Sequence, residues 1–100
     1  MKKDLNMRVG VALRVLRELS NKTQAQLAAD AGIPRSTLNN IEIGRRANSL
    51  ENLDKLSRAC GYSIGQLFSL VDGTDEELRA KIEERRKRLE LKLAAKTEKV

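Results

Sequence analysis

The chain has 100 residues, with 20 lysines and arginines against 14 aspartates and glutamates, which gives a net charge of +6 at pH 7. It contains one cysteine, so an intramolecular disulfide is excluded. It contains no histidine, so the Ser-His-Asp and Cys-His catalytic arrangements are excluded, and a zinc site is nearly excluded. The length favours one domain, and the positive charge favours a polyanionic partner, with nucleic acid as the first candidate.

The composition also limits the fold. The chain has one tyrosine, one phenylalanine, no tryptophan and one proline, and its apolar residues do not alternate as in a strand. We therefore expect an all-α fold. No apolar run approaches the length of a membrane span, and the N-terminus lacks the apolar segment of a signal peptide, so we expect a cytoplasmic protein with no membrane partner. No set of residues suggests an enzyme, a cofactor or a metal site.

Residues 1–5 carry no clear pattern and are expected to be loose. A helical stripe of apolar residues follows and predicts a first helix over about residues 6–19. The stripe consists of Val9, Ala12, Leu13, Leu16 and Leu19.

The strongest local signals come next. Thr23 followed by Gln26 has the spacing of a capping box, so we expect a second helix over residues 24–31. Gly32 supplies the left-handed residue that ends a helix at little cost. Pro34 has a fixed φ that suits a helix start, so a third helix should begin directly after this tight turn.

That third helix, about residues 35–43, has two unlike sides. Leu38 and Ile41 point one way at ~100° per residue. The opposite side carries no carboxylate and offers the side-chain types that contact base edges in DNA, arginine for guanine and asparagine for adenine. We expect it to enter the major groove as the second helix of a helix-turn-helix. Its outward residues are Arg35, Ser36, Asn39, Asn40 and Ile43.

Residues 44–48 are expected to form a loop. Arg45 and Arg46 lie in it beside the third helix, and adjacent arginines suit backbone phosphates. Ser49 is expected to cap a fourth helix over about residues 50–60.

Two features complete this part of the chain. Cys60 shares a helical face with Leu53 and Leu56, which predicts a buried structural thiol. Ser63 and Gln66 form another capping-box pattern, which predicts a fifth helix reaching about Val71.

Residues 74–100 differ in composition from residues 1–73, and we expect a charged helix there, starting from a capping box of Thr74 and Glu77. Arginines at 85 and 86 interrupt its apolar stripe. Three interpretations remain open for this tail: a solvated helix, a dimerisation element and a docking site for another protein. The stripe consists of Leu78, Ile82, Leu89 and Leu93.

The segment 23–46 resembles the helix-turn-helix of phage repressor/Cro-type regulators, often called the XRE family. The similarity covers roughly residues 7–71 and implies a five-helix, repressor-like DNA-binding domain. The residues that carry it are Gln24, Ala28, Gly32, Leu38, Ile41 and the run from Ile41 to Arg46.

The resemblance also implies roles for particular residues. Gln24 would hold a DNA phosphate and brace the first residue of the recognition helix. Arg17 would form a partly buried ion pair with Glu42, tying the first helix to the end of the third. Lys22 departs from the family, which usually has an apolar residue there, so a hydrophobic staple is missing.

The expected function is sequence-specific binding of double-stranded DNA, at a palindromic operator, by a dimeric transcriptional regulator. A repressor is the first candidate. Two reading helices related by a twofold axis double the length of the site. The alternative is an antitoxin-type protein or a restriction–modification controller protein, which would bind DNA and use residues 74–100 for a protein partner.

Overall fold

The computed structural model describes residues 2–45, 49–73 and 76–98. Within these ranges the chain forms six α-helices and no strand, so the prediction of an all-α fold with a further C-terminal helix is confirmed. The helices are α1 (Lys2–Leu19), α2 (Gln24–Ala31), α3 (Arg35–Glu42), α4 (Leu50–Ala59), α5 (Ile64–Asp72) and α6 (Glu76–Glu98).

Local sequence chemistry sets most of the helix ends. Thr23 and Ser63 both form complete capping boxes, with Gln26 and Gln66, and Ser49 caps α4 by accepting from the Asn52 N–H. The capping box predicted for Thr74 and Glu77 lies outside the described residues.

The turn between α2 and α3 follows the predicted signals. Gly32 has a φ of 68°, where a side chain would be strained, and the Ile33 N–H donates to the Ala28 carbonyl. Pro34 stands at the N-cap of α3.

Several predicted boundaries differ from the structure, by one residue at the ends of α4 and α5 and as follows at α1 and α3. Residues 1–5 were expected to be loose, but α1 begins at Lys2. Once a helix is nucleated, each added residue contributes a hydrogen bond, so a short extension with ordinary helix formers is favoured. The third helix ends at Glu42, one residue earlier than predicted, and Ile43 is its C-cap.

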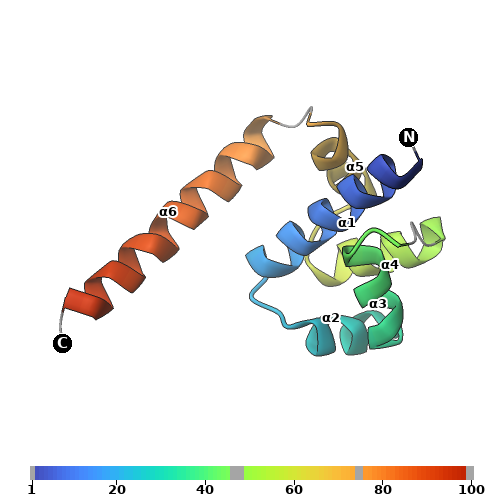
Figure 1. Ribbon diagram of the computed structural model, residues 1–100, viewed down its shortest axis with the longest axis horizontal. Helices are drawn as coiled ribbons and strands as arrows, with labels where there is room; N and C mark the ends of the chain where they lie inside the picture. The colour runs from blue at the N-terminus through green and yellow to red at the C-terminus, as the bar shows by residue number, and fades with distance from the viewer. Residues whose placement is uncertain (1, 46–48, 74–75, 99–100) are drawn as a thin grey trace.

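One core holds α1 to α5 together. It consists of apolar side chains that all belong to these five helices and the turns between them. Its fully buried members are Leu13, Leu16, Leu27, Leu38, Ile41, Leu56 and Leu67. Cys60 is also buried, as predicted, and burial raises the pKa of its thiol. Figure 1 shows the five helices gathered into one body, with α2 and α3 side by side at one end.

Helix α1 approaches the end of α3 very closely at Gly10. A Cβ on this residue would lie 2.3 Å from the Ile41 carbonyl oxygen and 2.7 Å from that of Glu42. Both are backbone atoms of α3, so they cannot move aside as a flexible side chain would. Gly10 therefore sets the distance at which α1 supports α3.

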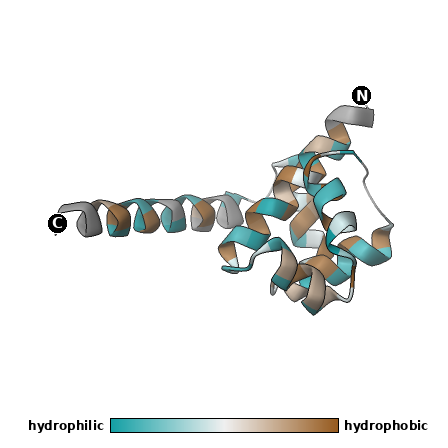
Figure 2. Ribbon diagram, turned by 60° about the horizontal axis from the view of Figure 1, so that its bottom comes forward, coloured by the Kyte–Doolittle hydropathy of each residue, from teal (hydrophilic) through white to brown (hydrophobic). Residues whose placement is uncertain are grey.

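Helix α6 stands apart from this body. Figures 1 and 2 show it running away from α1–α5 as one straight rod. A small cleft where α6 meets the body is lined by Val15 and Leu19 of α1 and by Ile82 and Leu89 of α6. Leu89 is 47% exposed and Leu91 69% exposed, so the body covers only part of the apolar surface of α6.

A helix that crosses a bilayer needs about 20 mostly apolar residues. Over residues 2–45, 49–73 and 76–98, no helix combines the necessary length with sufficient apolar character.

Candidate nucleic-acid interface

The two sides of α3 are separated as the sequence predicts. Leu38 and Ile41 have no exposed surface and anchor the helix on the core. Arg35, Ser36 and Asn39 are exposed on the other side, and Asn40 is half-buried. The exposed side of α3 therefore offers a guanidinium, a hydroxyl and amides to a partner.

The end of α3 positions the next residues. The Gly44 N–H donates to the Ile41 carbonyl and the Arg45 N–H to the Asn40 carbonyl, which together form a Schellman ending. Ile43 is 50% exposed and Arg45 is exposed, so both are accessible beside α3. Arg46, the other predicted phosphate contact, lies outside the described residues.

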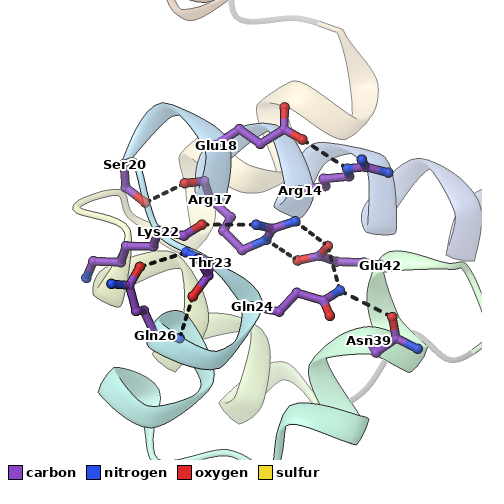
Figure 3. A network of polar contacts seen from close by, with 10 residues as sticks. All are labelled: Arg14, Arg17, Glu18, Ser20, Lys22, Thr23, Gln24, Gln26, Asn39 and Glu42. Carbon is purple, nitrogen blue, oxygen red and sulfur yellow. Dashed lines mark hydrogen bonds and ion pairs between the residues drawn. The ribbon is translucent and has the colours of Figure 1, made fainter.

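The structure contains the ion pair between Arg17 and Glu42. Arg17 Nε lies 2.8 Å from Glu42 Oε2, and a second guanidinium nitrogen lies 3.0 Å from Oε1 (Figure 3). The side chains are only 13% and 3% exposed. The hydrogen bond to Glu42 raises the pKa of Arg17, and the third nitrogen donates to the Lys22 carbonyl at 3.0 Å. This pair connects α1 rigidly to the last turn of α3.

Gln24 joins the same network, but not through the residue that the resemblance implied. Its Nε2 lies 3.1 Å from Glu42 Oε1 and 3.2 Å from Asn39 Oδ1. The expected partner was Arg35, the first residue of α3. The amide instead meets the last turn of α3, where the carboxylate of Glu42 is a stronger acceptor than a neutral group. Figure 3 shows Glu42 of α3 between Arg17 of α1 and Gln24 of α2, with Asn39 contacted by Gln24.

Lys22 folds back onto the protein and replaces the missing hydrophobic staple. Its Nζ lies 2.8 Å from Asp30 Oδ2 and 2.6 Å from the Ala59 carbonyl oxygen. The carbonyls at the end of α4 carry the negative end of the helix dipole, so an ammonium group is favoured there. Lys22 therefore links the turn after α1 to α2 and α4.

Sequence reasoning missed the contribution of Gly10. The available signal was a glycine inside the apolar stripe of α1, which often marks a close approach of backbones. Which backbone it approaches could not be read from that pattern, because the contact with Ile41 and Glu42 spans more than thirty residues of chain.

A comparison with protein-family models identifies the fold at the sequence level. The Helix-turn-helix model HTH_3 matches residues 13–67, which include α2, α3 and the turn between them. The chain belongs to this helix-turn-helix family. It is a DNA-binding regulator, and α3 occupies the position of the recognition helix.

Curated relatives of this HTH_3 protein are regulators. A competence pilus inhibition repressor of Acinetobacter baylyi is 35% identical over 71 residues, which is 71% of this chain and 64% of the repressor. The chain thus spans less than two thirds of that protein. Control protein C.MunI of a Mycoplasma species is 36% identical over 69% of this chain and 95% of its own length.

Solved structures agree with the family assignment. The clp gene regulator ClgR from Corynebacterium glutamicum superposes with a TM-score of 0.66 at 28% identity, covering 88% of this chain and 93% of ClgR. The restriction-modification controller protein C.AhdI from Aeromonas hydrophila has a TM-score of 0.60 at 34% identity, covering 62% of this chain and 94% of C.AhdI. The ClgR alignment leaves only 12% of this chain unmatched, so it extends into α6.

Proposed function

We propose that this HTH_3 protein is a dimeric, sequence-specific repressor that inserts α3 into the major groove of a palindromic operator in the cytoplasm. The observation that carries the proposal is the exposed side of α3, where Arg35, Ser36 and Asn39 face solvent without a carboxylate. Arginine and asparagine contact guanine and adenine edges, serine contacts either, and an apolar side chain such as Ile43 contacts the thymine methyl group.

Contacts to the DNA backbone would position α3 in the groove. Arg45 lies directly after α3 and is exposed, which supports a phosphate contact, and Arg46 follows it in the chain. Both hydrogens of the Gln24 amide are directed at Glu42 and Asn39, so we assign its phosphate contact to the backbone N–H in the first turn of α2. Such contacts fix the register on DNA and carry no sequence information directly.

The base-reading proposal predicts the behaviour of two variants. Arg35→Ala and Asn40→Ala should each lose about 1–3 kcal/mol of specific binding, because each removes one contact to a base edge. Each should also relax the preference at one operator position. Selection of bound duplexes from a random pool, followed by titration of the selected operator, measures both effects.

Arg45→Ala is the matched control for these variants. It should weaken binding to all sequences about equally and lower the slope of log affinity against log salt by roughly one, because it removes a phosphate contact. Unchanged base preferences in both Arg35→Ala and Asn40→Ala would contradict the assignment of α3 as the base-reading element.

Helix α6 is proposed to contribute to the dimer, with residues 1–73 as the DNA-binding domain. Leu89 and Leu93, four residues apart on one side of α6, are 47% and 65% exposed, and a second copy would bury this surface. The alignment with ClgR reaches the same helix, so the segment has a counterpart in another regulator.

A chain ended after Gly73 tests this role of α6. It should stay folded, because every residue of the described core lies before residue 73. Its dimer dissociation constant should rise, and its operator affinity should fall with it, since binding and dimerisation are linked. Sedimentation of both chains over a concentration series measures the constants, and equal values would return the dimer contact to α4 and α5.

A second candidate function is that of a controller protein for a restriction–modification system. Two relatives carry such names, C.MunI as a control protein and C.AhdI as a restriction-modification controller protein. A nuclease gene beside the gene for this chain would favour this function, whereas a toxin gene would favour an antitoxin with α6 as the partner-binding segment.

A further inference from the structure

The amide of Asn39 is oriented by a chain of acceptors and donors that begins inside the protein. Glu42 is 3% exposed and accepts two hydrogen bonds from Arg17. Gln24 Nε2 lies 3.1 Å from the same carboxylate and 3.2 Å from Asn39 Oδ1. In Figure 3 the oxygen of Asn39 points toward Gln24 and its nitrogen points away.

Only one arrangement of donors and acceptors is possible along this series of hydrogen bonds. A carboxylate paired with arginine can only accept hydrogen bonds, so Gln24 must turn its NH₂ group toward Glu42. The second hydrogen of that NH₂ group then meets Asn39, which must present its oxygen. If the Asn39 amide were turned over, two NH₂ groups would face each other without an acceptor between them.

We infer that Asn39 presents a donor-only amide to DNA and therefore selects guanine, whose major-groove edge carries the two acceptors O6 and N7, over adenine, whose N6 donor would face the Asn39 NH₂ group. Bidentate recognition of adenine needs the amide oxygen and nitrogen together, and here the oxygen faces α2. Gln24 is then a positioning residue for specificity. The inference rests on the proposed function of α3 and adds to it the base class that one of its residues selects.

The first test needs no DNA. In protein labelled with ¹⁵N, the Gln24 NH₂ protons should exchange with water at least about tenfold more slowly than those of Asn39, because only the former are held between protein acceptors. Slower exchange at Asn39 than at Gln24 would mean that the amides have the opposite polarity and would overturn the inference.

The second test identifies the base. Duplexes selected by the wild-type protein and by Asn39→Ala should differ at one operator position, where the wild type prefers a G·C pair. Asn39→Asp, which keeps the oxygen toward Gln24 and replaces the outward NH₂ group with an acceptor, should change that preference to cytosine, whose N4 is a donor. A wild-type preference for an A·T pair there, or an equal loss on all sequences for Asn39→Ala, would overturn the inference.

The third test concerns the origin of the orientation. Gln24→Met keeps the length of the side chain but removes both hydrogen bonds, so the Asn39 amide becomes free to rotate and adenine should be accepted at the same position. Gln66→Met is the control, because it removes a glutamine from the capping box of α5, away from α3. Retained selectivity against adenine in Gln24→Met would overturn the positioning role.

These results also separate the inference from the proposed function. A protein that selects no DNA sequence at all contradicts the proposed function, while the exchange measurement still reports the polarity of the amides. A protein that selects an operator with adenine at the Asn39 position retains its proposed function and contradicts only the inference.

Discussion

Glu42→Ala is expected to lower the free energy of unfolding by about 3–5 kcal/mol, because it leaves a largely buried guanidinium without its counter-charge. Arg17 is 13% exposed and makes two contacts to Glu42, and the Gln24 amide loses an acceptor as well. Urea unfolding followed by circular dichroism measures the loss.

Glu18→Ala is the matched control on α1. It breaks the pair between Arg14 and Glu18, whose side chains are 64% and 55% exposed, and pairs of this kind contribute under about 1 kcal/mol. The double variant Arg17→Met with Glu42→Leu should recover much of the stability, because it removes both charges together. A loss for Glu42→Ala no larger than that for Glu18→Ala would show that the buried pair adds nothing to stability.

Gly10→Ala is expected to destabilise the protein by about 1–3 kcal/mol, the usual cost of overpacking, even though alanine favours a helix more than glycine does. The added methyl group would meet the Ile41 carbonyl oxygen at 2.3 Å, so α1 must move away from α3. Because α1 supports the end of the recognition helix, operator affinity should fall too. Thermal unfolding and operator titration of the same preparation measure the two effects.

Gly65→Ala provides the comparison for Gly10→Ala. A Cβ at Gly65 would meet only the Ser63 hydroxyl oxygen, at 3.7 Å, which is ordinary contact. The change to alanine should therefore be neutral or stabilising by up to about 1 kcal/mol. If Gly10→Ala proved as stable as Gly65→Ala, the close approach of α1 to α3 would not constrain the fold.

The sequence by itself was sufficient for the features that depend on neighbouring residues. The capping boxes at Thr23 and Ser63, the left-handed Gly32 and the helix start after Pro34 all form as predicted, because each depends on atoms only a few positions apart. The burial of Leu38 and Ile41 follows equally from the helical period. These signals determined the helix-turn-helix and the side of α3 that faces outward.

Only the tertiary structure decided how the helices are joined. Gln24 braces Asn39 and Glu42 rather than Arg35, and Lys22 reaches Asp30 and the end of α4. Such partners depend on crossing angles and distances between helices, which the period of a single helix does not contain. The helical period of the sequence determined that Asn39 faces outward. Which end of the Asn39 amide faces outward depends on the buried carboxylate of Glu42, which Asn39 reaches through Gln24, and this contact exists only in the tertiary structure.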